Sequence, residues 1–354
     1  MDSNLEEETK MESLTTLTTP DNLQQTFVIV PAKLRLIILA GFLLWKCRFS
    51  KPRKLLVFMN TQDMIDFHRD LFEHVLNGVN DDSKNSRNLR LLKLHGSMEQ
   101  KERLKILEEV KTSTDCVLFC TDVAARGLDL PQVDWIVQYN PPTTTADYVH
   151  RVGRTARIGA KGSSLIFTLP SEANFIKELE EANMNMLQLN AERVLEKLHA
   201  NAEISSKTGR YPSTMEEAAT DLQMKFETVI SKEDTLHKSA SQAYVSYVRS
   251  YASYPKDVRH IFSFKALHLG HIAKSFGLRD PPSQITGIGK GHWVKKEAQR
   301  KADLRREQKV IKAQEKRINQ KALVISEFSS GLEGIDMKET KSKKSSKGKS
   351  VKKK

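Results

Sequence analysis

Four short apolar runs in the first half of the chain permit few folds. None of them alternates between apolar and polar positions, which is typical of strands buried on both faces of a sheet. Segments with helical periodicity, 61–77, 99–111 and 144–157, lie between the runs. Because strands that alternate with helices form parallel sheets, we predict an α/β fold with helices on both faces. The runs are LLVFM (55–59), CVLFC (116–120), WIVQY (135–139) and SLIFTL (164–169).

The composition changes on both sides of this pattern. Residues 1–26 are acidic, rich in threonine and without hydrophobic periodicity, which is typical of disorder. Helical periodicity returns after Ser213 and Glu216, a pair at capping-box spacing. A stripe of tyrosines on a further helix indicates core packing: Tyr244, Tyr247, Tyr251 and Tyr254. We therefore predict a disordered lead-in (1–26), an α/β domain (27–183), a connecting segment (184–214), a small all-α domain (215–285) and a disordered tail (286–354).

The basic charge of the chain is confined to its end. The net charge of +13 comes from 57 Lys and Arg against 44 Asp and Glu. Residues 290–354 hold 21 of these basic residues and 8 of the acidic ones. Residues 1–289 are therefore neutral. A basic tail on a neutral body predicts a nucleic-acid or nuclear-transport partner.

Several other classes of protein and site are disfavoured. Three cysteines are too few for a disulfide framework, which indicates a reducing compartment. The apolar run 36–45 is too short to span a bilayer and predicts a core-facing helix, so we expect no membrane partner. His268 and His271 lie three residues apart, but no cysteine or carboxylate nearby completes four ligands, and we expect no metal site on this chain.

The stretch HRVGRTARIG (150–159) concentrates positive charge. Arg154 and Arg157 lie three residues apart, so on a helix both guanidinium groups would leave from the same face. The planar arginine fork suits a phosphate, whereas the alternative is a solvated basic turn. TDVAARGLD (121–129) directly follows the predicted strand 116–120, and LHGSMEQKERLK (94–105) also indicates the end of a strand that opens into a helix. Ligands of open α/β sheets bind beyond the carboxyl ends of the strands, which favours a binding site.

Five motifs in order resemble the C-terminal half of the DEAD-box RNA helicases. The stretch 250–283 is similar to the helical domain that follows the core in the nucleolar helicases of large-subunit ribosome assembly, and ISEFSSGLE (325–333) is similar to their tail. The resemblance covers roughly residues 25–335 and implies a RecA-like sheet domain. The motifs are LLVFMNT (55–61), LHGSMEQKER (94–103), TDVAARGLD (121–129), VDWIVQYNPP (133–142) and YVHRVGRTARIG (148–159).

The resemblance implies a role for each matching residue. Arg154 and Arg157 would be the catalytic arginine fingers that reach the γ-phosphate of ATP, and Asp129 would bind the ribose. His150 and Arg151 would couple the ATP site to the RNA site. Arg126 would either contact RNA or pair with Asp122. The expected RNA-binding residues are Gly96, Gln100, Arg103, Thr121 and Arg126.

The sequence contains neither G-x-x-x-x-G-K-[ST] nor Asp-Glu-Ala-Asp. The resemblance implies that an N-terminal RecA-like domain carries both motifs and holds most of ATP and Mg²⁺, so we expect this chain alone to be inactive. One interpretation is the C-terminal part of an ATP-dependent RNA helicase, a nucleotide-binding hydrolase of ribosome biogenesis and rRNA processing in the nucleus and nucleolus. Its partners would be ribosomal precursor RNA and pre-ribosomal proteins. The alternative is a non-catalytic protein that binds RNA or docks on pre-ribosomes.

Overall fold

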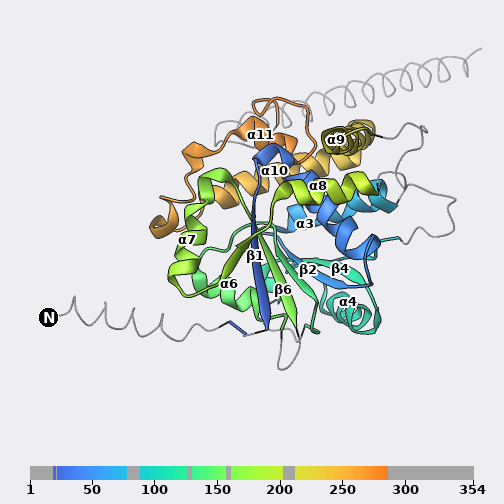
Figure 1. The fold of residues 1–354 in the computed structure, drawn as a ribbon. Helices are drawn as coiled ribbons and strands as arrows, with labels where there is room; N and C mark the ends of the chain where they lie inside the picture. The colour runs from blue at the N-terminus through green and yellow to red at the C-terminus, as the bar shows by residue number, and fades with distance from the viewer. Residues whose placement is uncertain are drawn as a thin grey trace, which may run out of the picture. The chain divides into compact units, whose positions relative to one another are not determined.

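The computed structural model describes residues 19–20, 22–77, 88–125, 130–156, 161–201 and 212–285. Within these residues seven strands form one sheet in the order β3-β4-β2-β5-β6-β1-β7, and all neighbours pair in parallel (Figure 1). This confirms the predicted parallel sheet. The strands are β1 (Leu23–Ile29), β2 (Lys54–Phe58), β3 (Leu91–Leu94), β4 (Cys116–Cys120), β5 (Trp135–Gln138), β6 (Gly162–Thr168) and β7 (Met186–Gln188).

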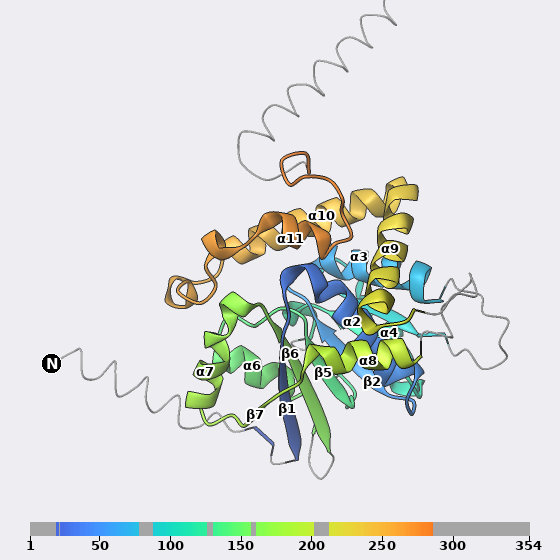
Figure 2. The ribbon, with the colours of Figure 1, turned by 45° about the horizontal axis from the view of Figure 1, so that its top comes forward.

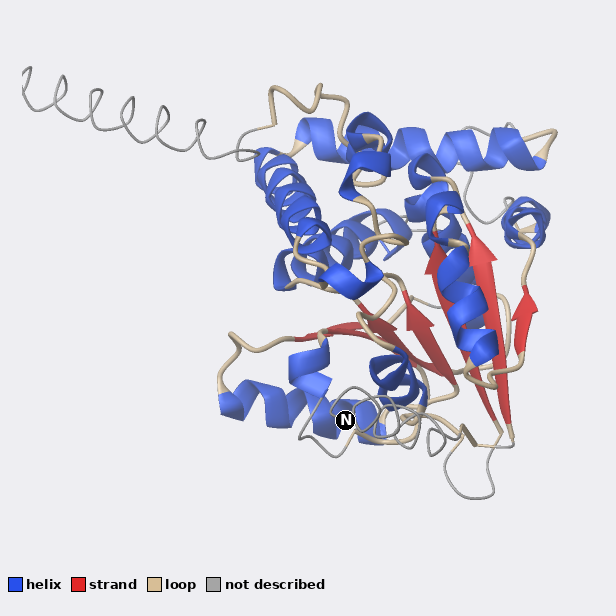
Figure 3. Ribbon diagram, turned by 90° about the vertical axis from the view of Figure 1, so that its left-hand side faces the viewer, coloured by secondary structure: helices blue, strands red, loops and turns tan. Residues whose placement is uncertain are grey.

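Successive residues of the central strands join different hydrophobic clusters on the two faces of the sheet. In β2, Leu55 and Val57 belong to the larger cluster, whereas Leu56 and Phe58 belong to the smaller one. Helices lie on both sides of the strands (Figure 3), which explains why the strands show no polar alternation. The helices of this part are α2 (Arg35–Leu43), α3 (Gln62–Phe72), α4 (Gln100–Thr112), α5 (Asp122–Ala125), α6 (Thr145–Val152), α7 (Asn174–Glu181) and α8 (Ala191–Ala200).

Helix α2 is buried over its whole length, as its apolar run predicts. It lies against α8 and continues into one wider turn, Leu44–Arg48. Among the described residues no helix is both long and apolar enough to cross a membrane.

The remaining helices form what we call the helical extension, residues 215–285. It contains α9 (Met215–Lys232), α10 (Asp234–Ala252) and α11 (Leu269–Lys274). Helix α10 packs on α3, and α9 packs on α8 (Figure 2). The tyrosine stripe is buried, and the buried Arg35 of α2 donates a hydrogen bond to the Tyr247 hydroxyl at 3.3 Å and lies 4.3 Å from the centre of the Tyr139 ring.

The extension is therefore not the separate domain that we predicted. Its apolar residues join those of one face of the sheet in the larger hydrophobic cluster, within one compact unit. The physical reason is that the helices of the extension bury their apolar faces against α3 and α8 as well as against one another. Periodicity shows that a helix has an apolar face, but it does not show what covers that face.

Three predicted boundaries differ from the structure at the ends of the sheet domain. Strand β1 begins at Leu23, inside the predicted lead-in, and the predicted connecting segment 184–214 contains β7 and α8. The N-cap of α9 is Thr214 rather than Ser213, because the Thr214 hydroxyl accepts the bond from the Glu217 amide at 3.2 Å. The tail 286–354 and residues 1–18 of the lead-in lie outside the described residues.

A fully buried histidine lies under the extension. His68 of α3 is surrounded by the rings of Phe67, Phe72, Tyr139 and Phe276, and its Nδ1 is 2.8 Å from the Met64 carbonyl oxygen, to which a neutral ring donates. Burial lowers the pKa of His68 from 6.5 to about 3. The folded protein therefore holds this ring neutral at pH values where the unfolded chain protonates it.

We expect the stability of the fold to fall below pH 6.5 partly because of His68. Between pH 6.5 and 3 the unfolded state binds one more proton at this residue, so the free energy of unfolding decreases as pH falls, by about 1.4 kcal/mol per pH unit. Urea unfolding should be measured at pH 7 and pH 5. Over this interval the free energy of unfolding of His68→Leu should decrease by about 2 kcal/mol less than that of the wild type. Phe67→Leu, which changes the ring beside His68 without removing a titratable group, is the control and should keep the wild-type pH dependence.

Candidate functional site

The predicted RNA-contacting residues follow the carboxyl ends of two adjacent strands. Gly96 lies in the turn after β3, and Thr121 follows β4 directly. The Thr121 amide lies 3.4 Å from the Leu94 carbonyl oxygen and donates to it, so the two loops lie side by side. A Cβ atom added at Gly96 would meet nothing within 4 Å, which leaves open space beside the backbone of this turn. This arrangement allows a ligand to approach the main chain closely.

Helix α4 begins at the same edge of the sheet. Its first turn presents Gln100, which is exposed, and Arg103, which is half-buried. The Arg103 Nη1 lies 3.4 Å from the Gln100 Oε1, and the Arg103 Nε is buried without a hydrogen-bond partner among the described residues. The turn thus offers a guanidinium group and an amide at the edge of the sheet where the Gly96 turn lies.

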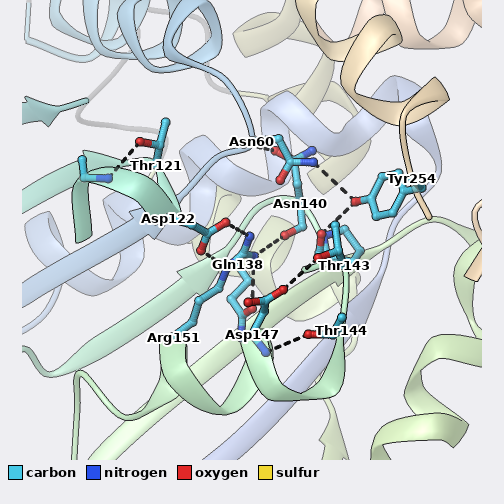
Figure 4. A network of polar contacts seen from close by, with 12 residues as sticks. Asn60, Thr121, Asp122, Gln138, Asn140, Thr143, Thr144, Asp147, Arg151 and Tyr254 are labelled. Atoms are coloured by element: carbon cyan, nitrogen blue, oxygen red, sulfur yellow. Dashed lines mark hydrogen bonds and ion pairs between the residues drawn. The ribbon is translucent and has the colours of Figure 1, made fainter. Parts of the chain in front are cut away.

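Arg151 of α6 forms the most extensive polar contacts of this edge (Figure 4). Its Nε and Nη2 donate to the two carboxylate oxygens of Asp122, at 2.7 and 2.6 Å. Its Nη1 donates to the Gln138 Oε1 at 3.2 Å and to the Asn140 carbonyl oxygen at 2.8 Å. The Arg151 side chain is only 3% exposed, and its guanidinium lies 5.1 Å from the centre of the Phe58 ring. The Arg151–Asp122 pair therefore ties α6 to the ends of β4 and β5.

Arg151 binds both carboxylate oxygens of Asp122. One of the two interpretations of Arg126 from the sequence was that it pairs with Asp122. Arg126 itself lies outside the described residues, as do Asp129 and Arg157. The roles predicted for these three residues stay predictions. His150 is described and lies exposed on α6.

Arg154 lies in a turn after α6, not on the helix that we predicted through residue 157. The helix ends at Val152, and Gly153 and Arg154 continue as a turn in which the Arg154 amide donates to the Arg151 carbonyl oxygen at 3.2 Å. The reason is a close approach of this turn to β6: a Cβ atom at Gly162 would lie 2.4 Å from the Thr155 Oγ1. The prediction that one helix carries both Arg154 and Arg157 is therefore wrong.

The Arg154 side chain is half-buried and forms no hydrogen bond or ion pair with any residue that the structure describes. It lies near the end of β4, where burial raises the pKa of the Cys120 thiol and the charges of Arg151 and Arg154 oppose that rise. A guanidinium at the carboxyl edge of the sheet is chemically suited to an anion such as a phosphate.

The structure adds three residues to the site that sequence reasoning missed. Asn60 and Asn140 follow β2 and β5, and the Asn60 amide donates to the Asn140 Oδ1 at 3.3 Å. The Tyr254 hydroxyl donates to the Pro141 carbonyl oxygen at 2.8 Å (Figure 4). Both asparagines lie inside quoted motifs, directly after predicted strands, and that position was an available signal. Nothing in the sequence linked Tyr254 to this edge.

The described residues contain no group of three or more His, Cys, Asp or Glu side chains that could hold a metal ion. The rings of His268 and His271 are stacked at 3.9 Å, and the His268 Nδ1 accepts the bond from the His271 amide at the start of α11. All three cysteines are buried and free.

Comparison with protein families identifies two matching regions. Residues 35–159 match the helicase conserved C-terminal domain. Residues 233–284 match the C-terminal extension described as ATP-dependent rRNA helicase SPB4-like.

Curated relatives match over much of this chain. It is 40% identical over 337 residues to the human ATP-dependent DNA helicase DDX31. The matched region covers 91% of this chain and 38% of the relative. It is 36% identical over 294 residues to the ATP-dependent RNA helicase dbp7 of Schizosaccharomyces pombe, covering 76% of this chain and 40% of the relative. The chain thus spans about two fifths of the length of these relatives.

Solved structures agree with the fold. Mss116p lacking its NTE and C-tail, bound to ssRNA and AMP-PNP, is 25% identical with a TM-score of 0.50, over 75% of this chain and 45% of that chain. The DEAD-box helicase Mss116 bound to ssRNA and UDP-BeF is 24% identical with a TM-score of 0.54, over 75% of this chain and 46% of that one.

Proposed function

This chain belongs to the DEAD-box ATP-dependent RNA helicases through its conserved C-terminal helicase domain and its SPB4-like extension, and from that premise we propose that it supplies the RNA-contacting and ATP-sensing part of such an enzyme. The observation that carries the proposal is the juxtaposition of Gly96, Thr121 and Arg103 beyond the carboxyl ends of β3 and β4. Arg154, which has no side-chain partner among the described residues, lies near the end of β4.

RNA is the proposed ligand of the Gly96 and Thr121 loops. Main-chain groups, a threonine hydroxyl and the Gln100 and Arg103 side chains suit phosphates and 2′-hydroxyls, which carry little sequence information. We therefore expect RNA binding with weak sequence preference. The rRNA in the description of the matching extension favours ribosomal precursor RNA, with pre-ribosomal proteins as partners and the nucleus and nucleolus as the site of action.

ATP is the proposed ligand on the side of Arg154. Arg154 and Arg157 would stabilise the γ-phosphate during hydrolysis, Asp129 would bind the ribose, and His150 and Arg151 would couple the two ligands. Mg²⁺ would neutralise charge on the phosphates, held mainly by an N-terminal RecA-like domain. Because the sequence has no P-loop pattern, we propose that this chain hydrolyses ATP only in combination with such a domain.

Arg103 offers a direct test of the RNA proposal. We expect Arg103→Ala to weaken binding of single-stranded RNA roughly fivefold, equivalent to about 1 kcal/mol, because the half-buried Arg103 places a guanidinium in the first turn of α4, at the carboxyl edge of the sheet. Binding should be measured by fluorescence anisotropy at about 0.3 M salt, where contacts of the basic tail are weakened. Arg90→Ala is the matched control, since Arg90 precedes β3 at the opposite edge and pairs with Glu109. Equal affinities for both variants would contradict the assignment of this edge.

The basic tail should supply much of the total RNA affinity. Residues 1–289 are neutral, so we expect removal of residues 290–354 to reduce the salt dependence of RNA binding. For a single strand, the slope of log K against log salt becomes shallower by roughly 0.7 for each phosphate that the protein no longer neutralises. Titrations at several salt concentrations measure this slope, and an unchanged slope after truncation would refute the role of the tail.

A further inference from the structure

We infer that the helical extension positions the ligand-binding edge of the sheet through the Tyr254 hydroxyl, which holds the loops after β2 and β5. Through Asn140, these loops contact the Arg151–Asp122 pair. The inference rests on the proposed function, because it assigns Tyr254 as a positioning residue for the site described there. Each link in it is a hydrogen bond between residues distant in sequence (Figure 4).

The first link is Tyr254 itself, just beyond the end of α10. Its side chain is buried, and its ring stacks on the Phe262 ring with centroids 4.4 Å apart and planes 18° apart. This stacking directs the hydroxyl out of the extension. The hydroxyl donates to the Pro141 carbonyl oxygen at 2.8 Å and lies 3.4 Å from the Asn60 Nδ2, from which it accepts. One atom of the extension thus contacts two loops of the sheet.

The second link is Asn140, which is 2% exposed. Its side-chain Oδ1 accepts from the Asn60 amide, and its carbonyl oxygen accepts from the Arg151 Nη1 at 2.8 Å. A displacement of the Asn60 and Pro141 loops therefore displaces an acceptor of Arg151. Because Arg151 also binds both oxygens of Asp122, the displacement reaches the segment that begins at Thr121.

A second contact from the extension supports the same loop. The Thr61 Oγ1 lies 2.8 Å from the Ser246 Oγ of α10. Thr61 is also the N-cap of α3, because its hydroxyl accepts a hydrogen bond from the Met64 amide. The loop after β2 is therefore held at two points on α10 and the turn that follows it. This leaves the position of Asn60 dependent on the extension.

Two variants separate the hydroxyl contact from packing. Tyr254→Phe keeps the stacked ring and removes the bonds to Pro141 and Asn60. Tyr244→Phe is the matched control, because the Tyr244 hydroxyl lies on the same stripe but contacts the Leu269 carbonyl oxygen within the extension, at 3.4 Å. Asn60→Ala removes the Asn60 side of the contact but leaves the bond to Pro141, so the double variant should add little to Tyr254→Phe.

The experiment is amide hydrogen exchange of the full chain, with and without a single-stranded RNA. In the free chain, we expect Tyr254→Phe to accelerate exchange in segments 58–62 and 138–143 by about threefold or more. With RNA, the protection of segment 121–125 should fall by a similar factor. Tyr244→Phe should leave both values unchanged, and both variants should retain the wild-type melting temperature to within a few degrees.

The outcomes distinguish this inference from the proposed function. If Tyr254→Phe exchanges its amide hydrogens at the wild-type rates, with or without RNA, the inference is overturned. The proposed function still stands in that case if RNA protects the wild type. Equal acceleration in Tyr244→Phe would also overturn it, because packing alone would then explain the effect. If the wild type gains no protection from RNA at 121–125, the proposed function fails. The free-chain comparison still decides whether Tyr254 positions the loops.

Discussion

Replacing Arg154 or Arg157 by alanine in a helicase completed with a matching N-terminal RecA-like domain should lower kcat by a factor on the order of 10³. An arginine finger stabilises charge that develops in the transition state, so its removal reduces the rate and leaves substrate binding largely intact. Arg154 is suited to this role because its side chain has no partner among the described residues and lies near the end of β4. RNA-stimulated ATP hydrolysis under saturating ATP and RNA measures the effect.

Three comparisons make this result specific. Arg157→Lys should restore little activity, because an ammonium keeps the charge but loses the planar fork. Arg90→Ala, at the opposite edge of the sheet, should keep the wild-type kcat. The chain of 354 residues by itself should hydrolyse no ATP, and hydrolysis by this chain free of contaminating ATPase would contradict the assignment of Arg154 and Arg157 as half of a site.

Removing the carboxylate of the Arg151–Asp122 pair should destabilise the fold strongly. Asp122→Ala leaves the guanidinium of Arg151, 3% exposed, without its counter-charge, although Asp122 itself is 30% exposed, so we expect a loss of about 2 kcal/mol. A decrease of this size is a large part of the stability of an ordinary domain. Equilibrium unfolding in urea, followed by circular dichroism, measures the change.

Asp70→Ala is the control for this experiment. Asp70 pairs with Arg69 at 2.9 Å, but the two side chains are 38% and 36% exposed, so we expect a change of less than about 1 kcal/mol. If Asp122→Ala is no more destabilising than Asp70→Ala, the Arg151–Asp122 pair does not hold the ends of β4 and β5 together.

The sequence predicted most strands because their burial is written in consecutive residues. CVLFC became β4 without a change of boundary, and the run 36–45 became the buried helix α2. Strand β1 was not predicted, because the polar residues Gln25 and Thr26 interrupt its apolar run. Their side chains are hydrogen-bonded to Tyr148 and to the Ser164 carbonyl oxygen, residues more than 120 positions away.

Some residues of the candidate site could be placed from the sequence, and others could not. Parallel strands bring their carboxyl ends to one edge, so residues placed directly after strands, such as Gly96 and Thr121, could be assigned to one surface from their order alone. The turn that carries Arg154 could not, because a helical pattern extended through it. Its conformation depends on contact with Gly162 of β6.

The sequence by itself determined the class of sheet, the family motifs and the charge of the tail, because each is a local property of consecutive residues. Only the tertiary structure decided that the extension joins the hydrophobic cluster on one face of the sheet, that Arg151 binds Asp122, and that Tyr254 reaches Pro141. The physical reason is that a buried polar or apolar group must find a partner, and the chain brings that partner from a distance that periodicity does not encode.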